Sequence, residues 1–431
     1  MTRQVHGLVD GDGLYFARAA AGGPYVFLAS TAVDESGKLA ADATVAPPYH
    51  TSPSAQVRAQ TAYIFDRYKE ALSAFGTTVN DIVQVEQYIE RKAHADGYLE
   101  ESRGPGNMER GRPGSALIAT GEIGPDGCVV NPTGIAVIPG EGYEKKISGS
   151  GEQDPGQHPE FGDAYAEEPV YNEIVTAGPY VFTVGDWSSD YESGIHPDAR
   201  APDWIWWGNE ARSETEFIMN ALRTRLESAG SSLEHTVHST FFLIDPADQY
   251  EVDLVLRKHI TGPPPARTVI PVRGLGTPRK EGVYTQAENA MKLESMFQSI
   301  KADGSIDREV VSTGAEQLGY QSEAIKAGPL LWTSGVLAGG PGGLDAGEDA
   351  ASQAKHVFGR IGEICEAGGT SIDKLLRVRA YVLDESDDAA VYDGLREAVP
   401  SDPPCVSITA VPGPLQVPGC RVMIDAVAYV D

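Results

Sequence analysis

The hydrophobic and polar positions of the chain follow one pattern three times. A glycine, two small hydroxyl residues and an aliphatic residue open the stretches GTTVNDIV, GSSLEHTV and GTSIDKLL, which begin at residues 76, 230 and 369. Successive copies are therefore 154 and 139 residues apart, an interval typical of a whole domain rather than of a solenoid repeat. We predict three tandem copies of one fold, which we call repeats 1, 2 and 3, over residues 1–145, 146–300 and 301–431.

An amphipathic helix is predicted directly before each of these stretches, because apolar residues recur there at three- and four-residue steps. These residues are Ile64, Tyr68, Leu72 and Phe75 in repeat 1, Phe217, Ala221, Leu222 and Leu226 in repeat 2, and Val357, Ile361 and Ile364 in repeat 3. Glycine enters the left-handed backbone region freely. We therefore expect Gly76, Gly230 and Gly369 to end the three helices.

Strands are predicted on both sides of each helix. A hairpin around GPYVFLAS, GPYVFTVG or GPLLWTSG opens each repeat, and a strand, a short second helix and a Pro-containing turn follow the first helix. The next strands lie in GRPGSALIATGEI, PPPARTVIPVRGL and DPPCVSITAVPGPL, and the closing strands in CVVNPTGIAVI, VYTQAENAMKL and CRVMIDAVAYV. The order β-β-α-β-α-β-β predicts an α+β fold with helices on one face of a sheet. Polar, Gly-rich segments at 139–160 and 300–316 are predicted linkers.

Composition narrows the possible partners. The chain has 34 Lys and Arg against 62 Asp and Glu, a net charge of −28 and a pI near 4.6, which argues against nucleic acid or an anionic membrane as partner. The sequence shows no apolar stretch of about 18 residues that could cross a bilayer and no signal peptide, so we expect a cytoplasmic location. The four cysteines are too scattered for a disulfide framework or a zinc motif, and no cofactor is predicted.

The repeated pattern resembles the RidA/YjgF/translation-inhibitor family. The resemblance covers nearly the whole chain and is carried by the GTTVNDIV-like stretches, by PPPARTV and by the terminal MIDAVAYV. It implies a chorismate-mutase-like fold and, since family members are homotrimers, a pseudo-trimer within one chain. Three such repeats would form a pseudo-threefold, barrel-like assembly with helices outside and three inter-repeat clefts that need not be equivalent. A monomer or a low-order oligomer is expected.

In that family an arginine of the Pro-Ala-Arg strand grips a substrate carboxylate, and a glutamate of the last strand serves water addition to an imine. A guanidinium suits this task because it binds a carboxylate through two parallel hydrogen bonds. The resemblance places Arg267 at the arginine position in repeat 2, with Ser115 and Val406 at the same position in repeats 1 and 3. Arg267 either anchors substrate or forms a surface ion pair. In repeat 1, Arg112 could reach the same cleft, or it could be a solvated loop residue together with Arg110.

The glutamate position is predicted to be altered in every repeat. Alignment of the predicted closing strands places Asn131, Gln286 and Met423 there, and Thr133, Glu288 and Asp425 two residues later. The side chains two residues later are expected to point to the other face, although a β-bulge could return Glu288 to the cleft. We therefore expect no standard general base in any repeat. Asn131 and Gln286 can still bind substrate or position water.

Other family positions add candidate residues in repeats 2 and 3. Tyr320 with Ser334 in repeat 3, and Tyr171 in repeat 2, match a family tyrosine and serine. Asp186 stands where a small residue is expected, and is either a replacement base or a strand-end cap. Repeat 2 also has an insertion with four tryptophans, namely Trp187, Trp204, Trp206 and Trp207. These rings could stack on a planar ligand, but a hydrophobic plug between repeats is favoured.

Together these residues favour an enzyme. The first hypothesis is a deaminase-like hydrolase that acts on a C–N bond of a small carboxylate substrate, with Asp186, Gln286 and Glu288 as candidate catalytic groups. The second is a chorismatase-like hydrolase or lyase on a cyclic ene-carboxylate. The third is a metabolite-binding protein without catalysis. One retained arginine beside a rebuilt loop favours a single specialised cleft.

Overall fold

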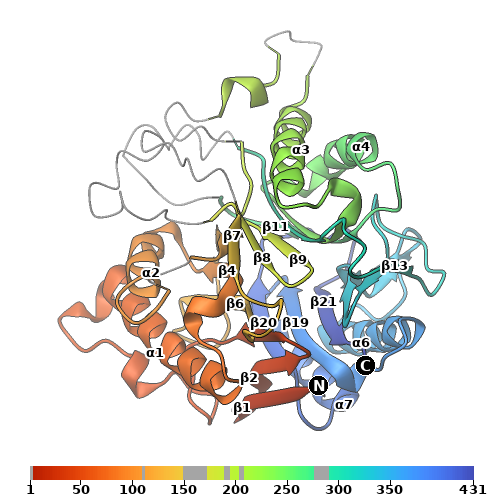
Figure 1. The fold of residues 1–431 in the computed structure, drawn as a ribbon. Coiled ribbons are helices and arrows are strands. Elements are labelled where there is room, and N and C mark those ends of the chain that lie inside the picture. Colours follow the sequence, from red (N-terminus) through yellow and green to blue (C-terminus); the bar gives the residue numbers. More distant parts are fainter. Residues whose placement is uncertain (1–2, 109–111, 149–171, 189–194, 203–207, 276–290) are drawn as a thin grey trace.

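The computed structural model describes residues 3–108, 112–148, 172–188, 195–202, 208–275 and 291–431. Within these residues the chain forms three mixed sheets, and each sheet draws all its strands from one of the three predicted repeats. Helices accompany every sheet, so the predicted α+β fold is confirmed (Figure 1). No helix of the described residues is both long and apolar enough to cross a membrane.

The three sheets share one strand order. In repeat 1 the order is β1-β2-β3-β6-β4-β5, with β1 (Gln4–Gly11), β2 (Leu14–Gly22), β3 (Tyr25–Ala29), β4 (Ile82–Ile89), β5 (Gly114–Ala119) and β6 (Val130–Val137). In repeat 2 it is β7-β8-β9-β12-β10-β11, with β7 (Lys146–Ser148), β8 (Ile174–Ala177), β9 (Tyr180–Thr183), β10 (Thr236–Leu243), β11 (Ala266–Pro271) and β12 (Leu293–Ile300). In repeat 3 it is β13-β14-β15-β21-β19-β20, with β13 (Arg308–Val311), β14 (Ala324–Ala327), β15 (Leu330–Thr333), β19 (Leu375–Val382), β20 (Cys405–Ala410) and β21 (Val422–Tyr429). Three two-residue strands complete repeat 3, namely β16 (Val336–Leu337), β17 (Gly339–Gly340) and β18 (Gly343–Leu344).

Strand pairing makes positions in the three repeats directly comparable. We call β4, β10 and β19 the central strands, β5, β11 and β20 the outer strands, and β6, β12 and β21 the closing strands. Each central strand pairs in parallel with its outer strand and antiparallel with its closing strand. Each also has one β-bulge after its first residue, between Ile82 and Gln84, Thr236 and His238, or Leu375 and Arg377. Residues at the same distance from this bulge are therefore equivalent.

The first helix of each repeat contains the predicted apolar residues and ends before the predicted glycine, and a shorter second helix follows. The helices are α1 (Pro53–Ala74), α2 (Ala95–Ser102), α3 (Glu210–Ser228), α4 (Gln249–His259), α6 (Ala350–Ala367) and α7 (Asp388–Ala398). Ser52, Asn209 and Asp349 cap the first helix of each repeat, because each side chain accepts a hydrogen bond from a backbone N–H of the first turn. Gly76, Gly230 and Gly369 follow these helices with φ values of 75°, 72° and 80°, which confirms their predicted role as helix stops.

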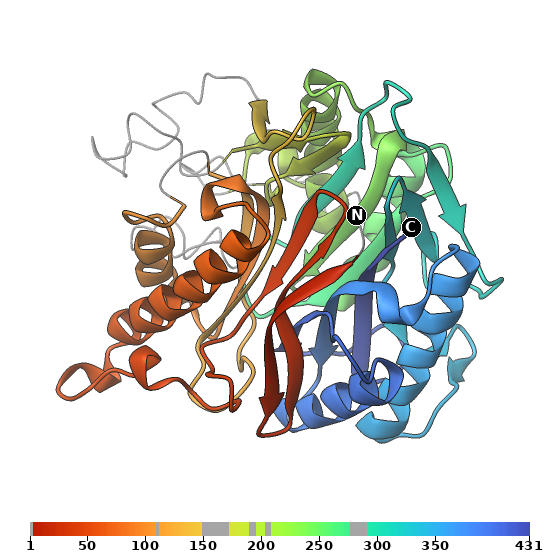
Figure 2. The same cartoon turned by 60° about the horizontal axis from the view of Figure 1, so that its bottom comes forward.

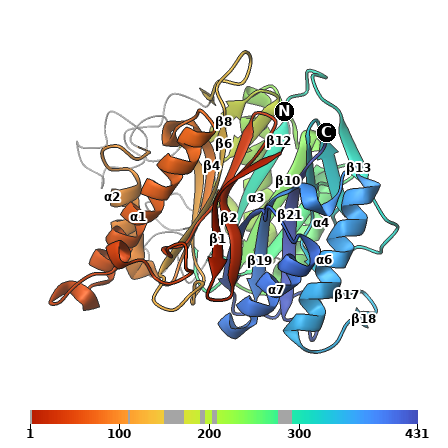
Figure 3. The ribbon, with the colours of Figure 1, turned by 90° about the horizontal axis from the view of Figure 1, so that it is seen from below.

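The repeats meet one another in a cyclic order. Aromatic residues of the three hairpins pack in one buried cluster, with ring centroids of Tyr25 and Tyr180 5.2 Å apart and those of Tyr180 and Trp332 6.2 Å apart. Tyr25 donates a hydrogen bond to the carbonyl of Ala177, and Tyr180 donates the equivalent bond to the carbonyl of Ala327. Figures 2 and 3 show the resulting arrangement, with strands toward the middle of the molecule and helices such as α1 and α6 on its outside.

Two sequence predictions about strands were wrong. Each sheet has a further edge strand, so the order in a repeat is β-β-β-α-β-α-β-β, and the predicted linkers 139–160 and 300–316 contain the edge strands β7 and β13. These strands are short, and β13 is largely polar and solvent-facing, so they lack the apolar alternation that reveals a strand. The closing strand of repeat 2 is β12, at Leu293–Ile300, and not the predicted VYTQAENAMKL segment.

Candidate active site

Each repeat meets the next through equivalent strands. The outer strands β5, β11 and β20 contact the hairpin strands β9, β15 and β3, and so form what we call the first, second and third cleft. In the first cleft the backbone N–H of Gly185 donates to the carbonyl of Ser115 at 3.0 Å. In the second cleft Gly335 donates to the carbonyl of Arg267, also at 3.0 Å. The clefts therefore have one backbone design and differ in their side chains.

Strand register identifies the arginine position of each cleft. The outer-strand residues paired with Val85, Ser239 and Val378 of the central strands are Ser115, Arg267 and Val406. These three partners occupy the same place relative to the β-bulge, so the register agrees with the equivalence drawn from the sequence. Arg267 is therefore the residue of repeat 2 at this position.

Register also identifies the closing-strand position, and here one prediction was wrong. Asn131 pairs with Tyr88, Met423 pairs with Tyr381, and the equivalent Phe242 pairs with Glu294. The residue of repeat 2 at the family's glutamate position is thus Glu294, so a carboxyl group is present at this position in this repeat. The predicted residues at or near this position, Gln286 and Glu288, lie outside the described residues. In repeat 2 an insertion makes the segment between the outer strand β11 and the closing strand β12 longer than the equivalent segments of repeats 1 and 3.

The carboxyl group of Glu294 is buried in the first cleft. Its residue is 4% exposed, and the carboxyl lies against Gly185 of its own repeat, which also neighbours Ala116 of repeat 1. A side chain at Gly185 would force Oε1 of Glu294 to move, so the glycine leaves room for the carboxyl group in this position. Oε2 has no hydrogen-bond partner among the described residues. Burial, and then the charge of Glu86, raise the pKa of Glu294 to about 8, so the group is largely protonated at neutral pH.

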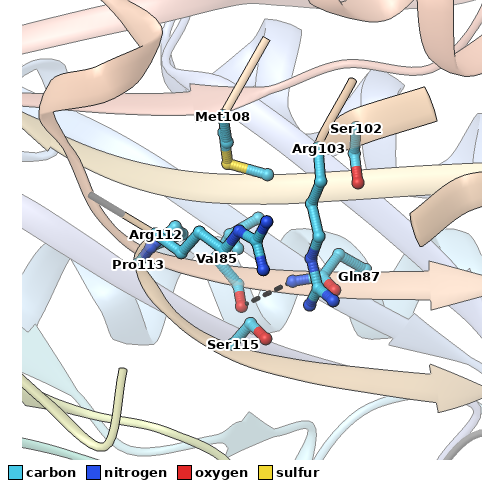
Figure 4. A pocket seen from close by; sticks show the side chains of 8 residues that line it. All are labelled: Val85, Gln87, Ser102, Arg103, Met108, Arg112, Pro113 and Ser115. Carbon is cyan, nitrogen blue, oxygen red and sulfur yellow. Dashed lines mark hydrogen bonds between the residues drawn. The ribbon is translucent and has the colours of Figure 1, made fainter. Parts of the chain in front are cut away.

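A cationic pocket lies beside this junction (Figure 4). It is narrow, with a cavity volume of about 10 Å³, and is lined by Val85, Gln87, Ser102, Arg103, Met108, Arg112, Pro113 and Ser115. Arg112 is 8% exposed, and Figure 4 shows the guanidinium groups of Arg103 and Arg112 directed toward the same space above Ser115. The structure therefore brings Arg112 and Ser115 together, as the sequence allowed. Two guanidinium groups suit a substrate carboxylate.

Asp186 supports the backbone beside Glu294. Its N–H donates to the carbonyl of Ser295 at 2.6 Å, and the N–H of Ser295 donates to its carbonyl at 2.9 Å. The Asp186 carboxylate forms an ion pair with Arg225 of α3, which also contacts Glu173 at 3.3 Å. The Asp186 carboxylate is thus engaged with a helix. Trp187 is partly buried against the hydrophobic core, whereas Tyr171, Trp204, Trp206 and Trp207 lie outside the described residues.

The second cleft keeps its arginine but has no carboxyl group at the closing-strand position. The Arg267 side chain is fully buried, and its Nη1 lies 2.6 Å from Oδ1 of Asp253 in α4. The backbone N–H of Tyr320 donates to the other oxygen of Asp253, and Gly319 packs directly over the guanidinium. Arg267 is therefore within ion-pair distance of an internal carboxylate, but its three guanidinium nitrogens make no hydrogen bond among the described residues. Met423 stands at the glutamate position of this cleft.

Ser334 and Tyr320 hold the second cleft together. Ser334 accepts a hydrogen bond from the backbone N–H of Arg267 and donates one to the carbonyl of Ser322. The hydroxyl of Tyr320 donates to the carbonyl of Ile260 at 2.6 Å, and Arg257 lies 4.6 Å from its ring centroid. Both predicted site residues thus link repeats 2 and 3.

The third cleft has a closing-strand amide that is already engaged. Asn131 donates to the carbonyl of Ile408 in the outer strand of repeat 3 at 3.0 Å. Tyr15 donates to the carbonyl of Val399, which repeats the Tyr320 contact of the second cleft. With Val406 at the arginine position, this cleft offers neither a cation nor a carboxyl group at the two family positions.

A larger groove of about 1,260 Å³ lies in repeat 3, beside Ser334 and α6. Its one strongly buried carboxylate, Glu323, accepts hydrogen bonds from the backbone of Thr313 and from Arg360 at 2.7 and 2.8 Å. The side chain of Gln321 is 7% exposed and its Oε1 has no hydrogen-bond partner among the described residues. The groove can hold a ligand, but it does not bring together an unpaired acid and a cation.

The described part of the chain contains no candidate metal-binding site. No group of three or more His, Cys, Asp or Glu residues is placed there to hold a metal ion. All four cysteines are buried and free, namely Cys128, Cys365, Cys405 and Cys420.

Comparison with known proteins supports this repeat architecture. A family model described as Endoribonuclease L-PSP matches residues 163–281 and 315–430. Protein mmf2, mitochondrial, of Schizosaccharomyces pombe is 27% identical over 111 residues, which make up 26% of this chain and 87% of that protein. A crystal structure of a member of the YjgF/YER057c/UK114 family from Mycobacterium tuberculosis is 30% identical and covers 29% of this chain and 100% of its own, with a TM-score of 0.26.

A chorismatase crystal structure covers more of the chain at a lower identity. It is 12% identical and covers 81% of this chain and 93% of its own, with a TM-score of 0.49. By contrast, the single-copy relatives each correspond to little more than a quarter of this chain.

Proposed function

The chain belongs to the Endoribonuclease L-PSP family, and from this premise we propose that it hydrolyses a C–N bond of a small imine or enamine carboxylate in its first cleft. The observation that supports the proposal is the buried Glu294 at the closing-strand position of the first cleft, whose pKa is raised to about 8 mainly by burial. The outer strand of the same cleft carries Ser115, which lines a pocket with Arg103 and Arg112. Of the three clefts, the first alone has a carboxyl group at the closing-strand position. The first cleft thus supports a single specialised site, as the sequence favoured. The proposed residues are Glu294 and Arg112, whereas the sequence pointed to Arg267.

An RNA substrate fits the chain poorly, although the family description names a ribonuclease. The net charge is −28, so a polyanion would be repelled over most of the surface. The arginines of the first cleft line a narrow pocket. A small carboxylate matches the charge of these two side chains.

The proposed reaction passes protons through Glu294. The neutral carboxyl group donates its proton to the nitrogen of the bound imine, which makes the imine carbon more electrophilic. The Glu294 carboxylate then accepts a proton from water as the water oxygen bonds to that carbon. Glu294, which holds the proton taken from water, donates it to the carbinolamine nitrogen as the C–N bond breaks. The Glu294 carboxylate then accepts the hydroxyl proton as the C=O bond forms, so that ammonia and a ketone leave and Glu294 is again neutral. Arg112 holds the substrate carboxylate during these steps.

Replacement of Arg112 by alanine tests the carboxylate site. We expect the KM for 2-iminopropanoate to rise about 10- to 100-fold, since a hydrogen bond to a charged group contributes about 1.5–3 kcal/mol. Ammonium release over the uncatalysed rate measures this. Arg58→Ala is the matched control, because Arg58 is a partly exposed residue of α1 that pairs with Glu100. An unchanged KM in Arg112→Ala would contradict the assignment.

The pH dependence of turnover tests the protonated form of Glu294. The pKa of this group is raised to about 8, so its acid form predominates below that pH. We expect kcat/KM to be level near neutral pH and to fall about tenfold for each pH unit above 8. The uncatalysed hydrolysis rate must be subtracted at each pH. A kcat/KM that rises through pH 8 would show that the ionised carboxylate is the active form.

A second candidate function is ligand binding without catalysis in the groove of repeat 3. The unpartnered Gln321 oxygen in a groove of about 1,260 Å³ favours it. A ligand there would raise the melting temperature without turnover. Chorismate is a useful comparison substrate, because pyruvate release from it would favour the chorismatase-like alternative.

The cyclic contacts also support a pseudo-trimer. The equivalent bonds of Tyr25 and Tyr180 join repeat 1 to repeat 2 and repeat 2 to repeat 3. The outer strand of repeat 3 returns to the hairpin of repeat 1. We therefore expect the 45.9 kDa chain to sediment as a monomer, and a threefold larger particle would contradict this.

A further inference from the structure

An equivalent backbone contact joins the repeats at each of the three clefts. A residue ahead of each hairpin turn donates its backbone N–H to the carbonyl of a proline ahead of the outer strand. The donor and acceptor are Asn172 and Pro113 at 3.5 Å in the first cleft, Ser322 and Pro265 at 2.9 Å in the second, and Ala17 and Pro404 at 3.0 Å in the third. The three junctions can therefore be compared residue by residue.

The first cleft differs in the residue that precedes this proline. The second and third clefts have Pro264 and Pro403 there, whereas the first has Arg112. A proline ring fixes its own φ and restricts the residue before it, so two successive prolines hold this segment by themselves. Arg112 lacks that ring. Its backbone therefore needs another restraint if its guanidinium group is to keep one place.

Asn172 of repeat 2 supplies such a restraint. Its side-chain Nδ2 donates a hydrogen bond to the backbone carbonyl of Arg112 in repeat 1. Asn172 is 7% exposed and Arg112 is 8% exposed, so water competes little for this bond. In the second cleft the hydroxyl of Ser322 donates the equivalent bond to the carbonyl of Pro264 at 2.6 Å. In the third cleft Ala17 has no side-chain donor.

The Arg112 side chain leads from this point into the pocket of the first cleft. Arg112 and Pro113 both line that pocket with Ser115, and Figure 4 shows the Arg112 guanidinium directed toward the space above Ser115. Because the carbonyl that Asn172 binds belongs to Arg112 itself, a shift of this backbone would move the guanidinium. In a narrow pocket even a displacement of about 1 Å weakens the hold on a substrate.

We propose that Asn172 is a positioning residue that fixes Arg112 for the substrate carboxylate, so that repeat 2 completes the anion site of repeat 1. This inference rests on the proposed function, in which Arg112 holds the substrate carboxylate. Asn172 acts through the Arg112 backbone and makes no contact with the substrate. The anion site of the first cleft is therefore incomplete without the neighbouring repeat.

Asn172→Ala tests this inference. We expect the KM for 2-iminopropanoate to rise about 3- to 10-fold, since one intramolecular hydrogen bond contributes a factor of this size. The kcat should change little, because the lost interaction binds substrate and transition state alike. Asn172→Ser should keep KM near the unsubstituted value, because serine makes the equivalent bond in the second cleft. Ser322→Ala is the matched control, which removes that bond from the second cleft and should leave KM unchanged.

The double variant Asn172→Ala/Arg112→Ala decides whether Asn172 acts through Arg112. Its KM should equal that of Arg112→Ala, because a positioning residue has no effect once the group it positions is gone. A further rise of KM in the double variant, or an unchanged KM in Asn172→Ala, would overturn the inference. Asn172→Leu keeps most of the buried volume and serves as the test if the alanine variant unfolds.

Pyruvate binding separates this inference from the proposed reaction. Pyruvate has the carboxylate of 2-iminopropanoate but no C–N bond, and titration calorimetry measures its Kd. If the unsubstituted protein binds pyruvate without turnover of the imine, the proposed reaction fails, and the Kd values of the same variants decide the positioning role. These values should follow the order expected for KM. Absence of pyruvate binding to the unsubstituted protein would overturn the inference together with the role of Arg112.

Discussion

Glu294→Gln is expected to lower kcat/KM for 2-iminopropanoate by about 10²–10⁴-fold while it stabilises the protein at alkaline pH. The activity falls because glutamine cannot transfer the proton that the reaction needs. Stability rises because ionisation of a carboxyl group buried at 4% exposure is unfavourable, and glutamine does not ionise. Relative to the unsubstituted protein, the free energy of unfolding of Glu294→Gln should increase by at most about 1.4 kcal/mol for each pH unit between 4.5 and 8. Ammonium release and thermal unfolding measure the two effects.

Glu214→Gln is the matched control for this substitution. Glu214 is also a buried acid of repeat 2, and burial raises its pKa to about 7. It accepts hydrogen bonds from the backbone N–H of Lys292. In repeats 1 and 3 a glutamine makes the equivalent contact, Gln60 with Val129 and Gln353 with Arg421, so glutamine suits this position. We expect Glu214→Gln to gain stability and keep its turnover. Equal loss of activity in both variants would show that repeat 2 is sensitive to any such change, and full activity in Glu294→Gln would remove the first cleft as the site.

Arg267→Met is expected to destabilise the protein by about 3–5 kcal/mol and to leave the turnover of the folded fraction unchanged. The loss arises because Asp253 would remain buried without its ion-pair partner. Urea unfolding at pH 7 measures it. The outcome differs from that of a substrate anchor, whose removal raises KM with a small change in stability.

The double variant Arg267→Met/Asp253→Leu separates the two roles of Arg267. It removes both charges and fills their space with apolar groups, so most of the lost stability should return. A stable Arg267→Met protein with a raised KM would instead return the substrate carboxylate to the second cleft. In that case Asp253 would be a group that substrate displaces.

Sequence patterns predicted the repeated elements well because local chemistry determines them. Gly76, Gly230 and Gly369 end helices in all three repeats, since the left-handed backbone conformation strongly favours glycine. The position of Arg267 in its strand also followed from sequence, because the PPPARTV turn fixes where that strand begins. Such signals span only a few residues and survive divergence between the repeats.

The residues of the candidate site could not be predicted in the same way. Glu294 was missed because an insertion separates β11 from β12, and the segment at the usual spacing contained a plausible strand. Only pairing with Phe242 in β10, more than fifty residues earlier, reveals its position. Register depends on long-range hydrogen bonds that a linear pattern does not encode.

The sequence by itself determined the fold class, the number of repeats and the type of residue at each outer strand. The tertiary structure decided which charges meet. It placed Asp253 against Arg267 in the second cleft, and it placed Arg379 of repeat 3 on Glu86 of repeat 1. The physical reason is that a buried charge is governed by neighbours within a few ångströms, and these neighbours come from repeats far apart in the sequence.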